Sequence, residues 1–201
     1  APILEWSQHF EADKDVWEEK ARLHLNWVLT QQQDNFWLAN CDNTEHKNLK
    51  PIIHTIAYTL DGLFDSGCLL KDEEYKNAAI GGAEILAQKF VERELLHGRY
   101  DKRWNGSEAF IPTGGAQLAI LWHKIARADT NAFWAEEARS SMNVLLSVIA
   151  TSGARTAKDV GGALQGSFPM WGRYESFGLP NWATKYMADS LMNELDWSNE
   201  R

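Results

Sequence analysis

Apolar residues recur at helical spacing along most of the chain. Over 13–33, the residues that fall on one helical face are Trp17, Ala21, Leu25 and Val28. The same spacing of three to four residues returns over 72–94 and over 129–150. This period is typical of amphipathic helices, whereas a half-buried strand alternates with a period of two. No alternating run of useful length occurs, so the pattern predicts an all-α protein.

Three further helices are expected to begin at prolines, namely Pro51, Pro112 and Pro180. Proline suits the first helical turn, because the N–H that it lacks would be unpaired there anyway. The helix after Pro51 is expected to end at Gly67. These three helices are rich in Gly, Ala and Thr, which suits a crowded inner layer.

The prolines mark an internal repeat. Trp37, Gly98 and Gly166 each stand fourteen residues before one of the prolines, and each fourteen-residue segment is rich in aromatic and polar residues. The unit is therefore a helix, an aromatic loop and a proline-started helix, present three times with a period of 60 to 70 residues. An extra segment, SGARTAKDVGGALQ, precedes the third loop, and its glycines argue against one continuous helix.

Helix pairs that repeat with this period predict an α/α toroid or a solenoid. We expect residues 1–201 to form a single α/α-hairpin repeat domain, a partial ring of about three helical hairpins. The proline-started helices would form the inner layer with their N-termini at one end. The three aromatic loops would gather there, and loops on a rigid scaffold commonly carry function.

The amino-acid composition limits the classes of partner that the protein is expected to bind. A net charge of −8 and a pI near 5.2 disfavour nucleic acid and acidic membrane surfaces. No apolar run approaches the roughly 20 residues that span a bilayer, so no membrane partner is expected. The two cysteines, Cys41 and Cys68, form no CxxC pair. We therefore expect both thiols to be reduced and partly buried, and the protein to be cytoplasmic.

The stretch from Gln31 to Trp37 reads QQQDNFW, and it resembles the QxxDGSW repeat of the squalene-cyclase and prenyltransferase toroids. Asn35 and Phe36 replace the Gly and Ser of that repeat. The segment LANCDNTEHKNLKPIIHTIAYTLDGL is similar to hairpins of the six-hairpin carbohydrate-active enzymes, which include glucuronyl hydrolases, sugar epimerases and uronate lyases. The resemblance implies an α/α toroid in which Gln31 and Trp37 serve packing between repeats.

The acid motifs of the terpenoid enzymes are absent, since neither DxDD nor DDxxD occurs. The resemblance to those families is therefore confined to the scaffold. A complete six-hairpin ring also needs about twice this length. The alternatives are half a ring, a fragment of a longer chain, or one protomer of a homodimer that closes the ring.

A polar stripe on the helix after Pro51 is the first catalytic candidate. His54, Tyr58 and Asp61 follow one another at i, i+4 and i+7, beside an apolar face. Histidine and tyrosine are side chains that proton-transfer enzymes use, and Asp61 could orient the imidazole. The alternative is that these are interfacial polar residues, satisfied by hydrogen bonds between hairpins.

The segment PMWGRYESF, residues 169–177, is the second candidate. Trp171 and Tyr174 could bind a sugar ring, Arg173 could pair with a carboxylate, and Glu175 could act as acid or base. The alternative is a loop whose aromatic residues only close the end of the repeat.

A weaker parallel lies in GRYDKRW, where Tyr100 and Arg103 could contact a substrate. Asp42 and Glu175 come from different loops and could form a hydrolase pair. No recognised metal-ligand spacing occurs, so neither a metal nor another cofactor is expected.

Three functions follow from these features. The first is a carbohydrate-active or carbohydrate-binding toroid, with a glycan or small-molecule substrate of uronate type and acid–base chemistry. As an enzyme it would be a glycoside hydrolase, a polysaccharide lyase or a sugar epimerase. The second is a non-catalytic helical-repeat interaction module. The third, favoured least, is an isoprenoid-related toroid enzyme.

Overall fold

Helices dominate the computed structural model, which describes residues 1–9, 13–43, 47–129, 131–151 and 161–199. The elements in these ranges are α1 (Pro2–Ser7), α2 (Lys14–Gln31), α3 (Ile53–Leu70), α4 (Glu73–Arg93), β1 (Arg99–Tyr100), β2 (Gly106–Ser107), α5 (Pro112–Asp129), α6 (Ala132–Thr151) and α7 (Asn181–Asn199). The all-α prediction is confirmed, and all six predicted helices are present. The short helix α1 and the small antiparallel hairpin β1–β2 were not predicted.

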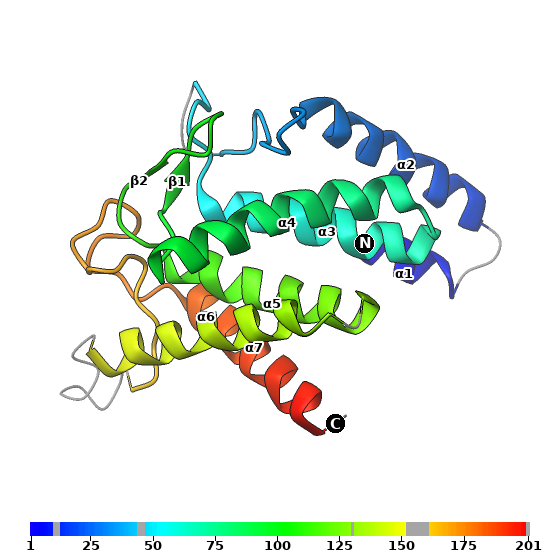
Figure 1. The fold of residues 1–201 in the computed structure, drawn as a ribbon. Coiled ribbons are helices and arrows are strands. Elements are labelled where there is room, and N and C mark those ends of the chain that lie inside the picture. The colour runs from blue at the N-terminus through cyan, green and yellow to red at the C-terminus, as the bar shows by residue number, and fades with distance from the viewer. Residues whose placement is uncertain (10–12, 44–46, 130, 152–160, 200–201) are drawn as a thin grey trace.

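The most extensive helix pairs are α3 with α4 and α5 with α6, whereas α2 contacts chiefly α1 and α4 (Figure 1). Helix α3 packs on α4 and α5, and α5 packs in turn on α6 and α7. Helices α3, α5 and α7 therefore form one layer, and α4 and α6 cover its outer side. These three are the proline-started helices, as the sequence predicted for the inner layer.

Helix α5 lies at the centre of this arrangement. Every residue from Pro112 to Ala126 is buried except Lys124. A Cβ added at Gly114 would lie 2.5 Å from Cγ2 of Ile53 on α3, so only glycine permits the observed approach of these two inner helices. The small residues at the start of α5 thus bring the inner layer together.

Gly67 does not end α3, which continues to Leu70. The cap is Lys71, which adopts a left-handed conformation with φ of 53°. Gly67 instead lies where α4 crosses closely, since an added Cβ would stand 2.8 Å from the backbone nitrogen of Lys76. The prediction that Gly67 ends the helix was therefore wrong, and the glycine instead allows α3 and α4 to pack closely.

Trp37 packs between repeats, as predicted. Its indole is buried and donates to the carbonyl oxygen of Tyr100 in the next loop. Within the part of the chain that the structure describes, the side-chain hydrogen bonds of Gln31 are local and join it to Thr30 and Asn40. The inter-repeat contact is made by the next residue, since Gln32 Nε2 donates to a carbonyl oxygen of α4 at 2.9 Å. The expectation for Gln31 was therefore off by one position.

Helix α2 is only lightly covered. Leu25 is its one buried residue, and its side chains Leu23 and Trp27 are exposed. The predicted break within SGARTAKDVGGALQ falls largely outside the described residues. No described helix is long and apolar enough to cross a bilayer. Cys41 and Cys68 are both free; Cys41 is half-buried and Cys68 is exposed.

Candidate functional site

The loops between outer and inner helices gather at one end of the molecule, on the left of Figure 1. They pair with one another, because Ile52 forms a bridge with Arg99 and Phe110 forms one with Phe168. Each loop is therefore held by backbone hydrogen bonds to the next. This end of the fold is a continuous surface built from three repeats.

A pocket of about 570 Å³ opens in this surface, and we call it the loop-end pocket. Its lining residues are Lys50, Arg99, Ser107, Glu108, Ala109, Trp171, Gly172 and Arg173. Trp171 is 71% exposed, and the side chain of Arg173 is 86% exposed. An indole and a guanidinium are thus both open to solvent in one pocket.

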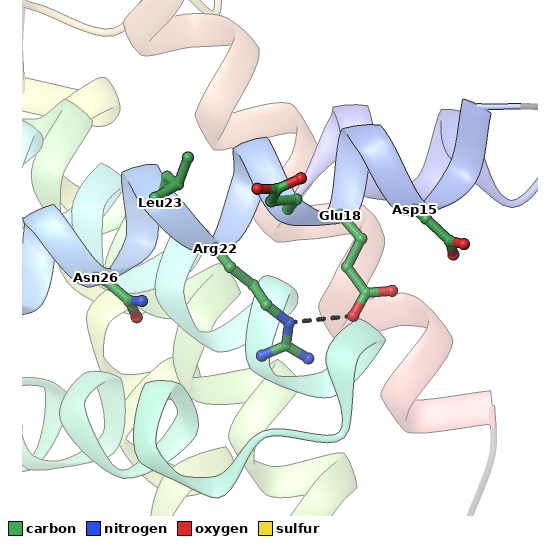
Figure 2. A pocket seen from close by; sticks show the side chains of 6 residues that line it. Asp15, Glu18, Arg22, Leu23 and Asn26 are labelled. Atoms are coloured by element: carbon green, nitrogen blue, oxygen red, sulfur yellow. Dashed lines mark hydrogen bonds and ion pairs between the residues drawn. The ribbon is translucent and has the colours of Figure 1, made fainter.

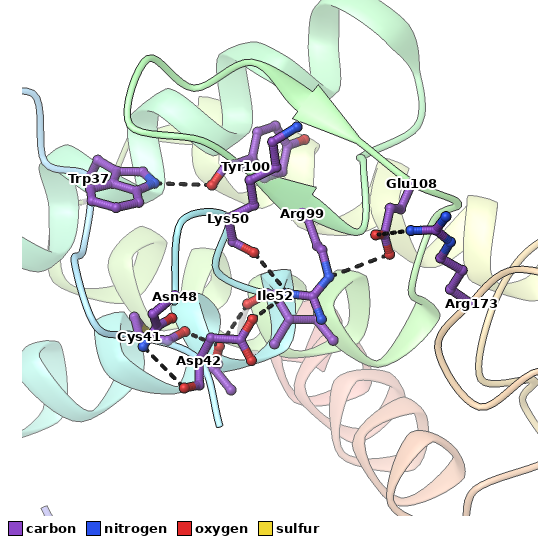
Figure 3. Close-up of polar contacts among 11 residues, drawn as sticks. Trp37, Cys41, Asp42, Asn48, Lys50, Ile52, Arg99, Tyr100, Glu108 and Arg173 are labelled. Carbon is purple, nitrogen blue, oxygen red and sulfur yellow. Dashed lines mark hydrogen bonds and ion pairs between the residues drawn. The ribbon is translucent and has the colours of Figure 1, made fainter. Parts of the chain in front are cut away.

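Ion pairs fix the floor of the loop-end pocket (Figure 3). Arg99 pairs with the buried carboxylate of Asp42 and donates from Nη1 to the carbonyl oxygen of Lys50 at 2.8 Å. Glu108 links the two arginines, because its carboxylate lies 3.4 Å from Arg99 Nε and 3.6 Å from Arg173 Nη1. Glu108 is the only acidic residue that lines the pocket, beside three cationic ones.

A cluster of aromatic rings joins the loop between α6 and α7 to the inner helices α3 and α7. The ring centroids of His54 and Tyr174 are 5.2 Å apart, and those of His54 and Tyr58 are 6.4 Å apart. The Tyr186 hydroxyl, on α7, hydrogen-bonds to the Tyr58 hydroxyl. The Trp182 indole donates to the Tyr174 hydroxyl at 3.2 Å. These five residues come from α3, α7 and the loop between α6 and α7.

The protonation states of this cluster follow from its partial burial. Burial is the main cause that lowers the pKa of His54, opposed by the negative charge of Asp42. Burial and the contact with Tyr186 raise the pKa of Tyr58 to about 12. At neutral pH, His54 is therefore an uncharged proton acceptor and Tyr58 keeps its proton.

A second pocket, of about 350 Å³, lies between α3, α5 and α7, and we call it the inner-helix pocket. Its lining residues are Ala57, Tyr58, Asp61, Gln117, Ile120, Lys124, Lys185, Tyr186, Asp189, Met192 and Asn193. Lys124 Nζ lies 2.7 Å from Asp61 and 2.6 Å from Asp65. Burial raises the pKa of Asp61, although the positive charge of Lys124 acts against this shift.

The predicted site residues therefore divide between two pockets. Tyr58 and Asp61 line the inner-helix pocket, whereas Trp171 and Arg173 line the loop-end pocket, and the two pockets share no lining residue. His54 lines neither of them. The two candidate groups therefore do not share one cavity, although the ring of Tyr174 in the 169–177 loop contacts His54 on the helix stripe.

Three further predicted residues lie away from both pockets. Tyr100 is 1% exposed, and its hydroxyl accepts a hydrogen bond from the backbone nitrogen of His97. It is a core residue, so we drop it as a substrate contact. Arg103 is exposed in the β1–β2 hairpin region. Glu175 is exposed in a turn where φ is 46°.

Several pocket residues were not predicted. Lys50, Arg99 and Glu108 in the loop-end pocket lie beside predicted residues, so the aromatic-loop pattern could have drawn attention to them. Gln117 and Asp189 lie on α5 and α7. No motif marks them, because their proximity to α3 depends on how the helices pack.

A third hollow lies along α2 (Figure 2). All six residues that line it belong to α2, and the labelled ones include Glu18 and Arg22, whose side chains are 3.1 Å apart. Two of these residues are already occupied by the start of α4, because Arg22 pairs with Asp72 and the Tyr75 hydroxyl donates to Asn26. Among the described residues, no group of three or more His, Cys, Asp or Glu side chains could hold a metal ion.

No protein-family model matches the chain, and no curated protein sequence matches it. Solved structures do match. A GH76 alpha-mannanase from Bacteroides thetaiotaomicron superposes with a TM-score of 0.63 at 14% identity, over 92% of this chain and 47% of that one. An unsaturated glucuronyl hydrolase variant, solved with dGlcA-Glc-Rha-Glc, gives 0.70 at 10% identity, over 94% and 55%. An alpha-amylase from Clostridium perfringens gives 0.61 at 11% identity, over 96% and 53%.

The fold is an α/α toroid. Structural likeness at 10% to 14% sequence identity shows a shared fold alone. It confirms the resemblance to toroid proteins that the sequence indicated. The structural neighbours are carbohydrate-active enzymes. The chain spans about half the length of these neighbours, which agrees with the expectation of a partial ring.

Proposed function

We propose that this protein binds a carbohydrate at the loop end of its helical array, and that the sugar carries a carboxylate. The observation that supports this most directly is the presence of exposed Trp171 and Arg173 in one pocket. The flat apolar face of an indole suits the C–H face of a sugar ring. A guanidinium binds a carboxylate through two parallel hydrogen bonds.

The charges of the loop-end pocket favour an acidic sugar over a neutral one. Lys50, Arg99 and Arg173 line it together with the single carboxylate of Glu108. Among the described residues, these three cations exceed the carboxylates of Glu108 and Asp42 by one charge. A positively charged pocket on a chain of net charge −8 attracts anions locally, although the protein as a whole repels them.

His54 and Tyr58 are the candidates for acid–base chemistry, and because neither lines the loop-end pocket, we propose it only for a sugar that also reaches the aromatic cluster of His54, Tyr58 and Tyr174. His54 is half-buried and uncharged at neutral pH, so it can accept a proton. Tyr58 retains its hydroxyl proton and can donate it. Asp61 and Glu175 are the candidate carboxylates. The reaction class would be that of a lyase or an epimerase, with a hydrolase as the alternative.

The proposal is tested with glucuronate-containing oligosaccharides and their neutral counterparts. Isothermal titration calorimetry should show binding of the acidic glycans, with an affinity that falls as salt is added. Turnover is followed by ultraviolet absorbance for a new double bond and by chromatography for released or epimerised sugar. Equal affinity for the acidic and the neutral members of each pair would exclude the proposed carboxylate recognition.

A non-catalytic interaction module is the second candidate, and exposed apolar residues at both edges of the array favour it. Leu23 and Trp27 are exposed on α2, and Met192 and Leu195 are exposed on α7. Such faces are commonly covered by another chain. A second copy would bury them, and sedimentation velocity over a range of concentrations measures this directly. No observation favours an isoprenoid enzyme, since the acid motifs are absent.

A further inference from the structure

We propose that the inner-helix pocket is a second binding site, that it accepts an uncharged polyhydroxylated ring such as a neutral hexose, and that Gln117 recognises this ring. The inference stands apart from the loop-end pocket, because no residue lines both. The proposed site for a neutral sugar can therefore be tested independently of the binding of an acidic sugar.

The side chain of Gln117 is the decisive feature. Gln117 is 4% exposed and lines the inner-helix pocket, and neither its amide oxygen nor its amide nitrogen has a hydrogen-bond partner among the described residues. Buried polar groups are almost always paired, because an unpaired one destabilises the fold. Both ends of the amide are unpaired in the wall of the pocket, so a rotation of the Gln117 side chain would present them to a ligand that enters it.

The chemistry of an amide fits a hydroxylated ligand. The glutamine side chain offers two donor hydrogens and one acceptor oxygen. A sugar hydroxyl both donates and accepts, so two neighbouring hydroxyls can satisfy both ends of one amide. A carboxylate or a phosphate can only accept, and it would leave the amide oxygen of Gln117 unpaired.

The charged residues around the pocket also favour an uncharged ligand. Lys124 is paired with Asp61 and with Asp65, and Lys185 Nζ lies 2.6 Å from Asp189. Every lysine that lines the pocket therefore already has a carboxylate partner. No uncompensated positive charge remains for an anionic ligand, in contrast to the loop-end pocket.

Two tyrosines complete the pocket. Tyr58 is 51% exposed, and its ring stands edge-on to Tyr186, with the ring planes at 87°. Their hydroxyls share one hydrogen bond, so one hydroxyl proton remains free to donate. Exposed tyrosine rings give apolar area and a polar tip together, which suits a sugar. The volume of about 350 Å³ falls within the usual range of roughly 300–1000 Å³ for small-molecule sites.

The test uses NMR of the side-chain amide of Gln117 in the ¹⁵N-labelled full chain. The probes are methyl α-D-mannopyranoside and methyl α-D-glucopyranoside, with methyl β-D-glucuronide as the charged comparison. Signals are assigned with Gln117→Met, which keeps the length of the side chain. We expect a neutral glycoside to shift the Gln117 signals in a saturable way, and Gln117→Met to weaken its binding by roughly tenfold or more.

Two controls separate this site from the loop-end pocket and from a structural role. The Gln117 signals report on the inner-helix pocket alone, so their titration with a neutral glycoside should follow the same curve in Trp171→Ala as in the parent. Gln117→Met should raise the melting temperature without sugar, because it removes an unpaired buried amide. The proposal is overturned if neither neutral glycoside shifts the Gln117 signals, or if Gln117→Met binds as well as the parent. A lower melting temperature for Gln117→Met would also overturn it, by showing that the amide serves the fold.

Discussion

The indole Nε1 of Trp37 donates a hydrogen bond of 3.1 Å to the carbonyl oxygen of Tyr100, which lies 63 positions further along the chain. A second bond runs the opposite way, from Trp104 Nε1 to the carbonyl oxygen of Asn35 at 2.9 Å. Two tryptophans thus join the first aromatic loop to the second. The loop-end pocket is built on this joined surface, so its shape depends on contacts between repeats.

Replacing Trp37 by Phe should weaken the fold. The substitution removes the indole N–H and leaves the buried carbonyl of Tyr100 without that donor, which typically costs about 1–3 kcal/mol. Urea unfolding followed by circular dichroism measures the change in free energy. Trp27→Phe is the matched control: Trp27 is exposed, so its change should stay within about 0.5 kcal/mol. Equal effects of the two substitutions would contradict the structural role of Trp37.

Replacing Asp42 by Asn should be strongly destabilising. The Asp42 side chain is fully buried against Arg99, and removal of one partner from a buried ion pair typically costs about 3–5 kcal/mol. The double variant Asp42→Asn with Arg99→Met also removes the guanidinium that would face the new amide, and it should recover part of this loss. Urea unfolding of both variants provides the comparison. A double variant that is less stable than the single one would show that Arg99 has a larger independent role.

Replacing Trp171 or Arg173 by Ala should reduce the affinity for a glucuronide by roughly tenfold each, equivalent to about 1.4 kcal/mol. Both side chains are exposed, so the melting temperature should not change. Arg173→Lys keeps the charge but not the planar guanidinium, and we expect it to restore the affinity only in part. Lys89→Ala on α4 is the control for loss of a distant positive charge. Isothermal titration calorimetry measures the affinity of each variant.

Acidification should destabilise the fold through His123. This histidine is fully buried, its Nε2 lies 3.0 Å from Glu194, and Arg127, Arg139 and Trp197 also face it. Burial is the main cause that lowers its pKa, although Glu194 acts to raise it. The unfolded chain therefore takes up a proton near the ordinary value of 6.5, at a pH where the folded chain still resists it.

The contribution of His123 to the free energy of unfolding should thus be fully present above pH 7 and should decline as the pH falls through 6.5. The measurement is the urea midpoint at several pH values between about 5 and 8. The comparison is His123→Gln, which cannot take up a proton and should lose less stability over this interval. A variant that declines as steeply as the parent would assign the pH dependence to other groups, such as His54.

The helices were predictable from sequence because each depends on a local pattern. The face of α4 shows this well, since the residues that follow the helical spacing over 72–94 are all buried, namely Tyr75, Ala79, Ala83, Leu86 and Phe90. Pro112 begins α5, as the proline rule indicates. The role of Gly67 was not predictable in the same way, because a glycine that ends a helix and one that admits a neighbouring helix look alike in one sequence.

The candidate site was predictable only in part. Trp171 and Arg173 stood out because an aromatic residue and a cation lie together in one loop, and the structure exposes both in one pocket. Tyr100 has the same local features but is buried beneath Trp104 and His97. Burial depends on which element covers a loop, and nothing within GRYDKRW specifies that.

By itself, the sequence determined the helical class, the three repeats and the gathering of aromatic loops at one end, because spacing, proline positions and periodicity are local properties of the chain. Only the tertiary structure decided which side chains share a pocket. Tyr58 and Tyr186 lie 128 positions apart and meet through their hydroxyls, and Gln117 reaches the same pocket from a third helix. Such meetings depend on the packing of α3, α5 and α7 at close range, where small residues such as Gly114 set how near the helices come.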